Sequence, residues 1–216
     1  MRFLSSVLLL VLILDLKAQE TKPSMTRIEF CNISPQINAD SFGAKPKIQY
    51  IAGETYSRCE EKPDPKEHIH GLIICAEPNI WMINLYTGMG NHIIDPGPTY
   101  VAHHNILPPD APKVFSSLEL GKEMTWFRSQ NAKEIGEQQI NGKKCQEFEV
   151  SIDNYRLVLL VGTENQKPLR IDIFKDDQLY ESLKYLSYET GLPFDPILFT
   201  PPVGIVINDQ KQIKNK

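Results

Sequence analysis

Residues 132–162 read AKEIGEQQINGKKCQEFEVSIDNYRLVLLVG, and this stretch carries the clearest strand and turn signals in the chain. Asn141-Gly142 separates two runs of strand-forming residues, and Asp153-Asn154 separates the second run from a third. Both pairs tolerate the positive φ angles that tight hairpin turns require. The sequence therefore predicts three consecutive antiparallel strands joined at these turns. Their expected ranges are 132–140, 143–152 and 155–162.

The same pattern continues towards the C-terminus. Asp176-Asp177 separates two further predicted strands, over 169–175 and 179–188. Residues 157–161 (LVLLV) are apolar at every position, and apolar side chains also occupy both faces of the strand over 179–188. A sheet with one wet face would alternate, so a helix, sheet curvature or a ligand must cover part of the second face.

Strand patterns also fill the N-terminal half of the chain. Residues 45–58 alternate as one long predicted strand with Gly53 as a bulge or bend, and further strands are predicted over 70–76 and 79–86. The proline-rich residues 95–112 predict a loop, or at most a short edge strand around residues 100–103.

One helix is predicted, over residues 113–129. Val114, Leu118 and Phe127 recur at roughly helical spacing, interrupted by Gly121. Such a helix would pack its apolar stripe on the sheet. With about eight or nine strands, the chain is expected to be mainly β with a helix (α+β), as a curved antiparallel sheet or half-open β-barrel wrapped on that helix.

The N-terminus has the layout of a signal peptide, residues 1–18. Arg2 is followed by an apolar run over 3–14 and a cleavage position after Ala18. The run is about 12 residues long, whereas a spanning helix needs about 20, so cleavage is favoured over an uncleaved anchor. We therefore expect export to the periplasm or the extracellular space.

The remaining chain is expected to form one domain. Residues 19–26 are predicted to be a disordered N-terminus, 27–207 the single β-rich domain, and 208–216 a polar tail. No later segment is apolar enough to span a membrane. A net charge of -4 and a pI near 5.8 disfavour nucleic acid as a partner.

Four cysteines, Cys31, Cys59, Cys75 and Cys145, suit structural disulfides in an oxidising compartment. Their spacing matches no zinc or redox motif, and three pairings are open. If the strands around the turn at 61–67 pair about residue 67, Cys59 lies opposite Cys75. We therefore predict Cys59 with Cys75, which leaves Cys31 with Cys145.

Catalytic and metal-binding patterns are absent from the polar residues. His68 and His70 would share one face of a strand, but no nearby acidic residue or cysteine completes a metal site at a known spacing. No G-x-S-x-G occurs, and no cysteine has a catalytic context. We predict no catalytic residue, metal or cofactor, and a hydrolase with an unrecognised site is the weakest alternative.

The order of several segments resembles the periplasmic lipoprotein-carrier superfamily, the LolA/LolB-like fold. These segments are residues 48–60 (IQYIAGETYSRCE), 79–94 (NIWMINLYTGMGNHII), 135–150, 167–171 (KPLRI) and 194–204 (FDPILFTPPVG). The resemblance implies an incomplete, strongly curved antiparallel barrel with an apolar interior. The chain departs from the carriers in having one predicted helix, where those carriers close the cavity with several.

We therefore expect an exported, non-enzymatic binding protein that holds a lipid or a lipoprotein acyl chain in a half-barrel. Large apolar side chains on one face of the N-terminal strands are the predicted lining: Tyr50, Tyr56, Leu72, Ile74, Trp81, Ile83 and Leu85. The alternative is a structural or regulatory envelope protein with a filled core, whose sheet recognises another protein.

Overall fold

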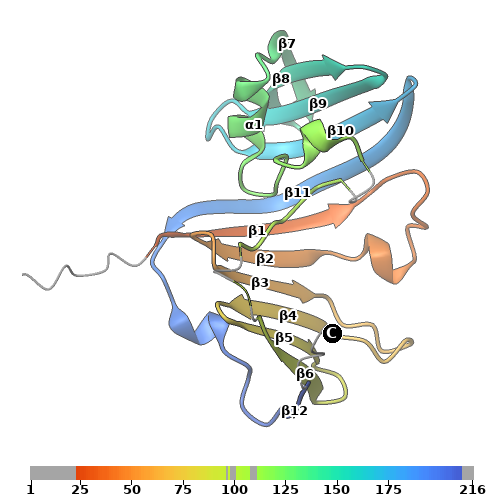
Figure 1. The fold of residues 1–216 in the computed structure, drawn as a ribbon. Coiled ribbons are helices and arrows are strands. Elements are labelled where there is room, and N and C mark those ends of the chain that lie inside the picture. Colours follow the sequence, from red (N-terminus) through yellow and green to blue (C-terminus); the bar gives the residue numbers. More distant parts are fainter. Residues whose placement is uncertain (1–22, 96, 98–100, 108–110, 211–216) are drawn as a thin grey trace, which may run out of the picture.

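The computed structural model describes residues 23–95, 97, 101–107 and 111–210. A single unclosed 12-stranded sheet runs through them in the order β12-β6-β5-β4-β3-β2-β1-β11-β10-β9-β8-β7. All neighbouring strands are antiparallel except β12, which is parallel to β6. Figure 1 shows the sheet curving and twisting from β7 to β12. The predicted fold class, mainly β with a helix in a curved open sheet, is confirmed.

We call β1–β6 with β12 the N-terminal half and β7–β11 the C-terminal half. The N-terminal half contains β1 (Met25–Asn32), β2 (Lys47–Ala52), β3 (Tyr56–Glu61), β4 (Gly71–Ala76), β5 (Asn79–Asn84), β6 (Met89–Ile94) and β12 (Val206–Asp209). The C-terminal half contains β7 (Lys133–Ile140), β8 (Lys143–Ile152), β9 (Tyr155–Gly162), β10 (Pro168–Lys175) and β11 (Gln178–Leu192). The helical elements are η1 (Phe42–Ala44), η2 (Lys113–Phe115), α1 (Glu123–Ser129) and η3 (Pro196–Phe199).

The hairpin turns predicted from sequence set the strand ends in the C-terminal half. Asn141 and Gly142 have φ angles of 49° and 78°, and Asp153 has 52°. Asp176 and Asp177 also have positive φ, at 50° and 61°. β8 and β9 therefore have the predicted bounds, and β7, β10 and β11 begin within a residue of theirs.

The predicted long strand over 45–58 is wrong, because the chain turns back on itself. Gly53, with φ 60°, lies in the turn between β2 and β3, which pair as a hairpin. The predicted alternation survives this change. Tyr56 pairs with Ala52, so it keeps the face that Ala52 and Tyr50 share.

The predicted helix over 113–129 is also shorter than expected. Residues 113–115 form the 3-10 helix η2, and only residues 123–129 form α1. Gly121 adopts φ 88°, a conformation that the α-helix excludes and glycine accepts. The α-helix therefore starts after this residue.

Two strands were missed at the ends of the domain. β1 begins at Met25, inside the segment 19–26 that was expected to be disordered, and it joins the two halves between β2 and β11. β12 ends at Asp209, inside the predicted polar tail. The predicted signal peptide, residues 1–18, lies outside the described residues, as do residues 211–216.

The two halves have separate hydrophobic cores on opposite faces of the sheet. Ile28 of β1 belongs to one core and Met25 of the same strand to the other. Because side chains three apart in a strand point to opposite faces, the two cores lie on different sides. We call the side with α1 the helix face, and the opposite side the strap face.

The helix core, on the helix face, joins α1 and η2 to the C-terminal half. Its buried members include Ile28, Phe115, Leu118, Trp126, Phe127, Leu157, Leu159, Ile171, Ile173, Leu183 and Tyr185. The strap core, on the strap face of the N-terminal half, lies beneath residues 193–205, which we call the strap. Its buried members are Met25, Ala52, Leu72, Ile74, Ile83 and Phe199.

Candidate functional site

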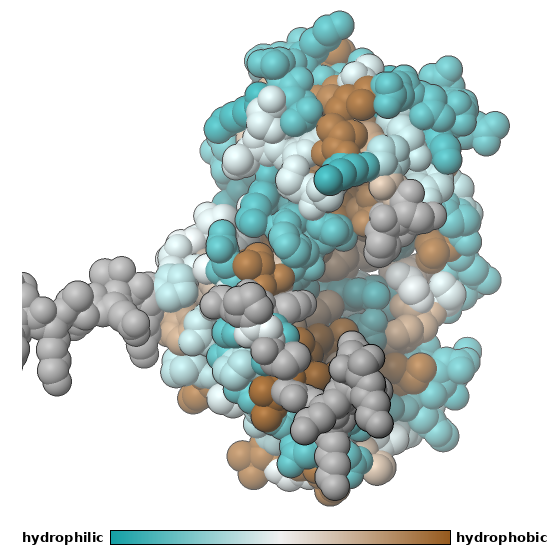
Figure 2. Space-filling view, viewed as in Figure 1, coloured by the Kyte–Doolittle hydropathy of each residue, from teal (hydrophilic) through white to brown (hydrophobic). Residues whose placement is uncertain are grey.

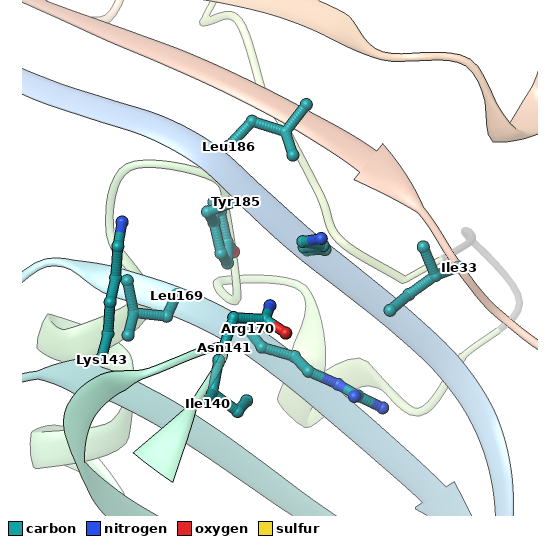
Figure 3. A pocket seen from close by; sticks show the side chains of 9 residues that line it. Ile33, Ile140, Asn141, Lys143, Leu169, Arg170, Tyr185 and Leu186 are labelled. Atoms are coloured by element: carbon teal, nitrogen blue, oxygen red, sulfur yellow. The ribbon is translucent and has the colours of Figure 1, made fainter.

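A pocket of about 380 Å³ opens on the strap face of the C-terminal half. The turn of the β7–β8 hairpin, the start of β10, the middle of β11 and the segment after β1 enclose it (Figure 3). Its lining residues are Ile33, Ile140, Asn141, Lys143, Leu169, Arg170, Lys184, Tyr185 and Leu186. This volume falls in the usual range for small-molecule sites, about 300–1,000 Å³.

The floor of the pocket is apolar and continues into a small buried cluster. Ile140 and Leu169 pack against Cys145, Val158 and Leu160. This cluster explains the unbroken apolar run of β9, since alternate residues of that strand enter the helix core and this second cluster. Both faces of β9 are therefore covered by the chain itself.

The mouth of the pocket exposes further apolar surface. Leu186 is 43% exposed and Ile33 is 40% exposed. Leu186 lies at a bulge, because the pairing of β1 with β11 shifts between Glu29 and Phe30. That bulge leaves Leu186 without a partner in the β1 register and places it at the pocket.

Three cations line the same pocket from three elements. Lys143 is the first residue of β8, Arg170 belongs to β10 and Lys184 to β11. Figure 3 shows Lys143 at one side of the pocket and the side chain of Arg170 extending in the opposite direction, away from Lys143. Arg170 and Lys184 are directly opposite each other in the sheet, a pairing that costs stability when both are charged.

Few anions compensate these charges. Arg170 Nε donates to Asp172 Oδ1 at 2.7 Å, and the Ser182 hydroxyl donates to the same oxygen at 2.6 Å. Within the described part of the chain, Lys143 and Lys184 form no ion pair, and no Asp or Glu lines the pocket. The pocket is therefore a site of positive potential in a chain of net charge -4.

The lining residues predicted from sequence lie elsewhere, and the structure brings them together. Tyr50, Tyr56, Leu72, Ile74, Trp81, Ile83 and Leu85 all belong to the strap core. The ring of Tyr56 contacts Phe194 and Phe199 at centroid distances of 5.0 and 5.4 Å. Arg58 Nη1 donates to the carbonyl oxygen of Leu198 at 3.2 Å. The chain's own strap therefore packs on this surface. The role of these seven residues in ligand binding stays a prediction.

A second hollow, of about 410 Å³, lies on the helix face of the N-terminal half, and we call it the groove. Ile73, Met82 and Met89 line it and are 47%, 42% and 52% exposed. Ile73 and Met82 oppose each other on β4 and β5. In Figure 2, brown hydrophobic residues are visible on the lower part of the molecule, where Figure 1 draws the N-terminal half.

The strand register does not place the members of either predicted disulfide pair opposite each other. β3 and β4 pair about residue 66, one residue earlier than assumed, so Cys59 opposes Ile73 and Cys75 opposes Ser57. β9, β10 and β11 separate the strands of Cys31 and Cys145. Burial raises the pKa of the Cys59 thiol to about 11, so it is protonated at neutral pH.

The histidines form no metal centre among the described residues. His68 has φ 54° in the turn before β4, so it does not share a strand face with His70. His68 stacks on Tyr86, and His70 Nε2 lies 3.1 Å from Glu60 Oε1. These contacts account for both rings within the fold.

Comparisons with known proteins give similarities of shape alone. No protein family profile matches the chain, and no curated protein matches its sequence. An uncharacterised conserved protein from Thermus thermophilus is 10% identical with a TM-score of 0.47, over 87% of this chain and 91% of that one. LprF from Mycobacterium bovis is 14% identical with a TM-score of 0.44, over 83% and 90%.

The MucA/MucB complex of Pseudomonas aeruginosa is a further similar structure. It is 12% identical with a TM-score of 0.44, over 82% of this chain and 56% of the matched chain, so this chain spans little more than half of that relative. With TM-scores below 0.5, these similarities carry no argument about function. Among the described helices, none has the length and apolar character to cross a membrane.

Proposed function

We propose that this chain is an exported, non-enzymatic binding protein that holds a lipid or acyl chain in the pocket between the β7–β8 turn and β10–β11. The observation that supports the proposal is an apolar pocket whose exposed mouth residues, Ile33 and Leu186, extend the apolar surface outwards. An acyl chain gains about 0.8 kcal/mol for each methylene that it buries. Burial of the alkyl chain drives binding at such a site.

Export to the periplasm or the extracellular space is part of the same proposal. The layout of residues 1–18 supports it, because a charged residue precedes a short apolar run and a small residue. A carrier of apolar chains is useful in the aqueous space outside the cytoplasmic membrane, where free acyl chains are poorly soluble.

Extraction of the purified protein tests the proposal. We expect mass spectrometry to find a co-purifying lipid, and a fluorescent fatty acid to bind the delipidated protein. Leu186→Gln, at the mouth, should weaken that binding, whereas Ile135→Gln on the exposed surface of β7 should leave it unchanged. Absence of both a lipid and fatty-acid uptake would overturn the proposal.

Recognition of another envelope protein is the second candidate function. It is favoured by the groove, where Ile73, Met82 and Met89 expose adjoining apolar side chains on a sheet face. If the groove binds an envelope protein, that partner should co-purify with the protein isolated from its native cells. Met82→Asp should abolish this co-purification, and Ile135→Asp should retain it. Equal partner recovery with both variants would contradict this role.

A further inference from the structure

We infer that the pocket selects amphiphiles with an anionic head group, a carboxylate or a phosphate, through Lys143, Arg170 and Lys184. The inference rests on the proposed function and specifies the ligand class of the same site. The apolar chain would lie against Ile140 and Leu169, with the head group among the cations.

Three separate elements each place one cation in a pocket without an acidic lining residue among those described. Arg170 and Lys184 oppose each other directly, and like charges in such a pair repel. A bound anion would remove this repulsion, and a neutral ligand would leave it in place.

The hydrogen bonds of Arg170 favour an oxyanion as its ligand. Its Nε is held by Asp172, which is only 9% exposed and is itself held by Ser182. The two Nη groups make no hydrogen bond to the described residues. The guanidinium is thus oriented by one edge while its other donors stay available, the arrangement that suits an oxyanion.

The apolar lining residues lie next to the cations. Ile140 pairs with Lys143 across the β7–β8 hairpin, and Leu169 directly precedes Arg170. A free inorganic anion would use the cations and leave these side chains wet. A ligand with both an anionic head and an alkyl chain uses the whole lining.

A matched set of ligands tests this inference on the delipidated mature protein. Dodecanoate and dodecyl phosphate carry the head groups, dodecanol carries the same chain without charge, and inorganic phosphate carries charge without a chain. We expect an anionic amphiphile to bind about tenfold or more tightly than dodecanol, because charge-assisted hydrogen bonds are stronger than neutral ones. The preferred head group is the one that binds more tightly.

Charge-neutral variants supply the second readout. Lys143→Gln with Lys184→Gln should lower affinity for the anionic amphiphiles about tenfold more than it lowers affinity for dodecanol. The control, Lys66→Gln with Lys133→Gln, changes the net charge equally at exposed positions outside the pocket. In the unmodified protein, added salt should weaken binding of the anionic ligands alone.

The outcomes separate the two proposals. Equal affinity for dodecanol and dodecanoate, without an effect of salt or of the lysine variant, would overturn the anionic selectivity and keep acyl-chain binding. If inorganic phosphate binds as tightly as dodecyl phosphate, the alkyl chain contributes nothing, and the inference that the ligand is an amphiphile is overturned. Failure of all the alkyl ligands to bind would overturn the proposed function itself.

Discussion

The two halves of the sheet bury their apolar residues on opposite sides and with different kinds of cover. In the C-terminal half α1 and η2 lie on the helix face, whereas in the N-terminal half the strap lies on the other face. Each half therefore leaves one face without that cover. The cationic pocket lies on the strap face of the C-terminal half, and the groove lies on the helix face of the N-terminal half. In this fold the two hollows therefore lie on the faces that carry neither the helices nor the strap, and the filled cores lie on the other faces.

The largest expected effect comes from the helix core. Phe127 of α1 is fully buried, with 0% exposure. Phe127→Ala should lower the free energy of unfolding by about 3–5 kcal/mol, because it removes a buried ring and leaves a cavity. Urea unfolding measures this loss. Val114→Ala, at a residue 38% exposed, is the control and should stay near zero.

Phe199→Ala makes the corresponding change in the strap core. Phe199 is 2% exposed and packs on Tyr56 and Phe194. We expect a loss at the lower end of about 3–5 kcal/mol, because the strap is a short segment that can settle into the space. Hydrogen exchange should accelerate in β3 and β4 and stay unchanged in β8 and β9. Equal acceleration in both halves would mean that the two cores do not behave separately.

A buried carboxylate distinguishes the helix core further. Glu123 is 1% exposed and accepts hydrogen bonds from the hydroxyls of Tyr185 at 2.8 Å and Tyr188 at 3.0 Å, and from the Gly121 amide at 3.0 Å. Burial raises the pKa of Glu123 above its ordinary value of 4.5, and these hydrogen bonds lower it less. The ionised form is therefore disfavoured in the folded state.

The sign of the pH effect follows from that shift. A carboxyl whose pKa is raised on folding adds stability below its unfolded pKa, near 4.5, and loses it as the pH rises through the raised folded pKa. Glu123→Gln should therefore stabilise the protein at neutral pH by about 1–3 kcal/mol and flatten this part of the pH profile. Thermal unfolding at several pH values checks it, with Glu137→Gln on exposed β7 as the control. A variant less stable than the parent at pH 7 would contradict this account.

The smallest effect is expected at the hairpin turn beside the pocket. Gly142 has φ 78°, and an L-residue in that region costs roughly 1–2 kcal/mol. Gly142→Ala should cost about that amount in urea unfolding. Gly43→Ala is the matched control, since a Cβ at Gly43 meets nothing closer than 3.7 Å. Equal losses at both glycines would argue against a left-handed residue in this turn.

Local chemistry predicted the C-terminal half better than the N-terminal half. Turn residues such as Asn141-Gly142 determine strand ends through their own φ angles, so β8 and β9 could be read directly. Gly53 is compatible with both a bulge and a turn, and only pairing of β2 with β3 decides between them. β1 was missed because its place between β2 and β11 depends on contacts distant in sequence.

The predicted lining residues were grouped correctly by alternation, but their cover was not predictable. Alternation places Tyr50 and Tyr56 on one face, yet it says nothing about which segment returns to pack there. The cationic pocket was missed for a related reason. Its three cations are far apart in sequence, and the bulge that exposes Leu186 arises only from the register of β1 against β11.

Backbone amide chemical shifts recorded on addition of dodecanoate map where an alkyl ligand binds. We predict that the largest changes fall on the β7–β8 turn, the start of β10 and residues 184–186. Changes centred on Tyr56, Leu72 and Trp81 would contradict the account, because they would place the ligand in the strap core instead of on the open face.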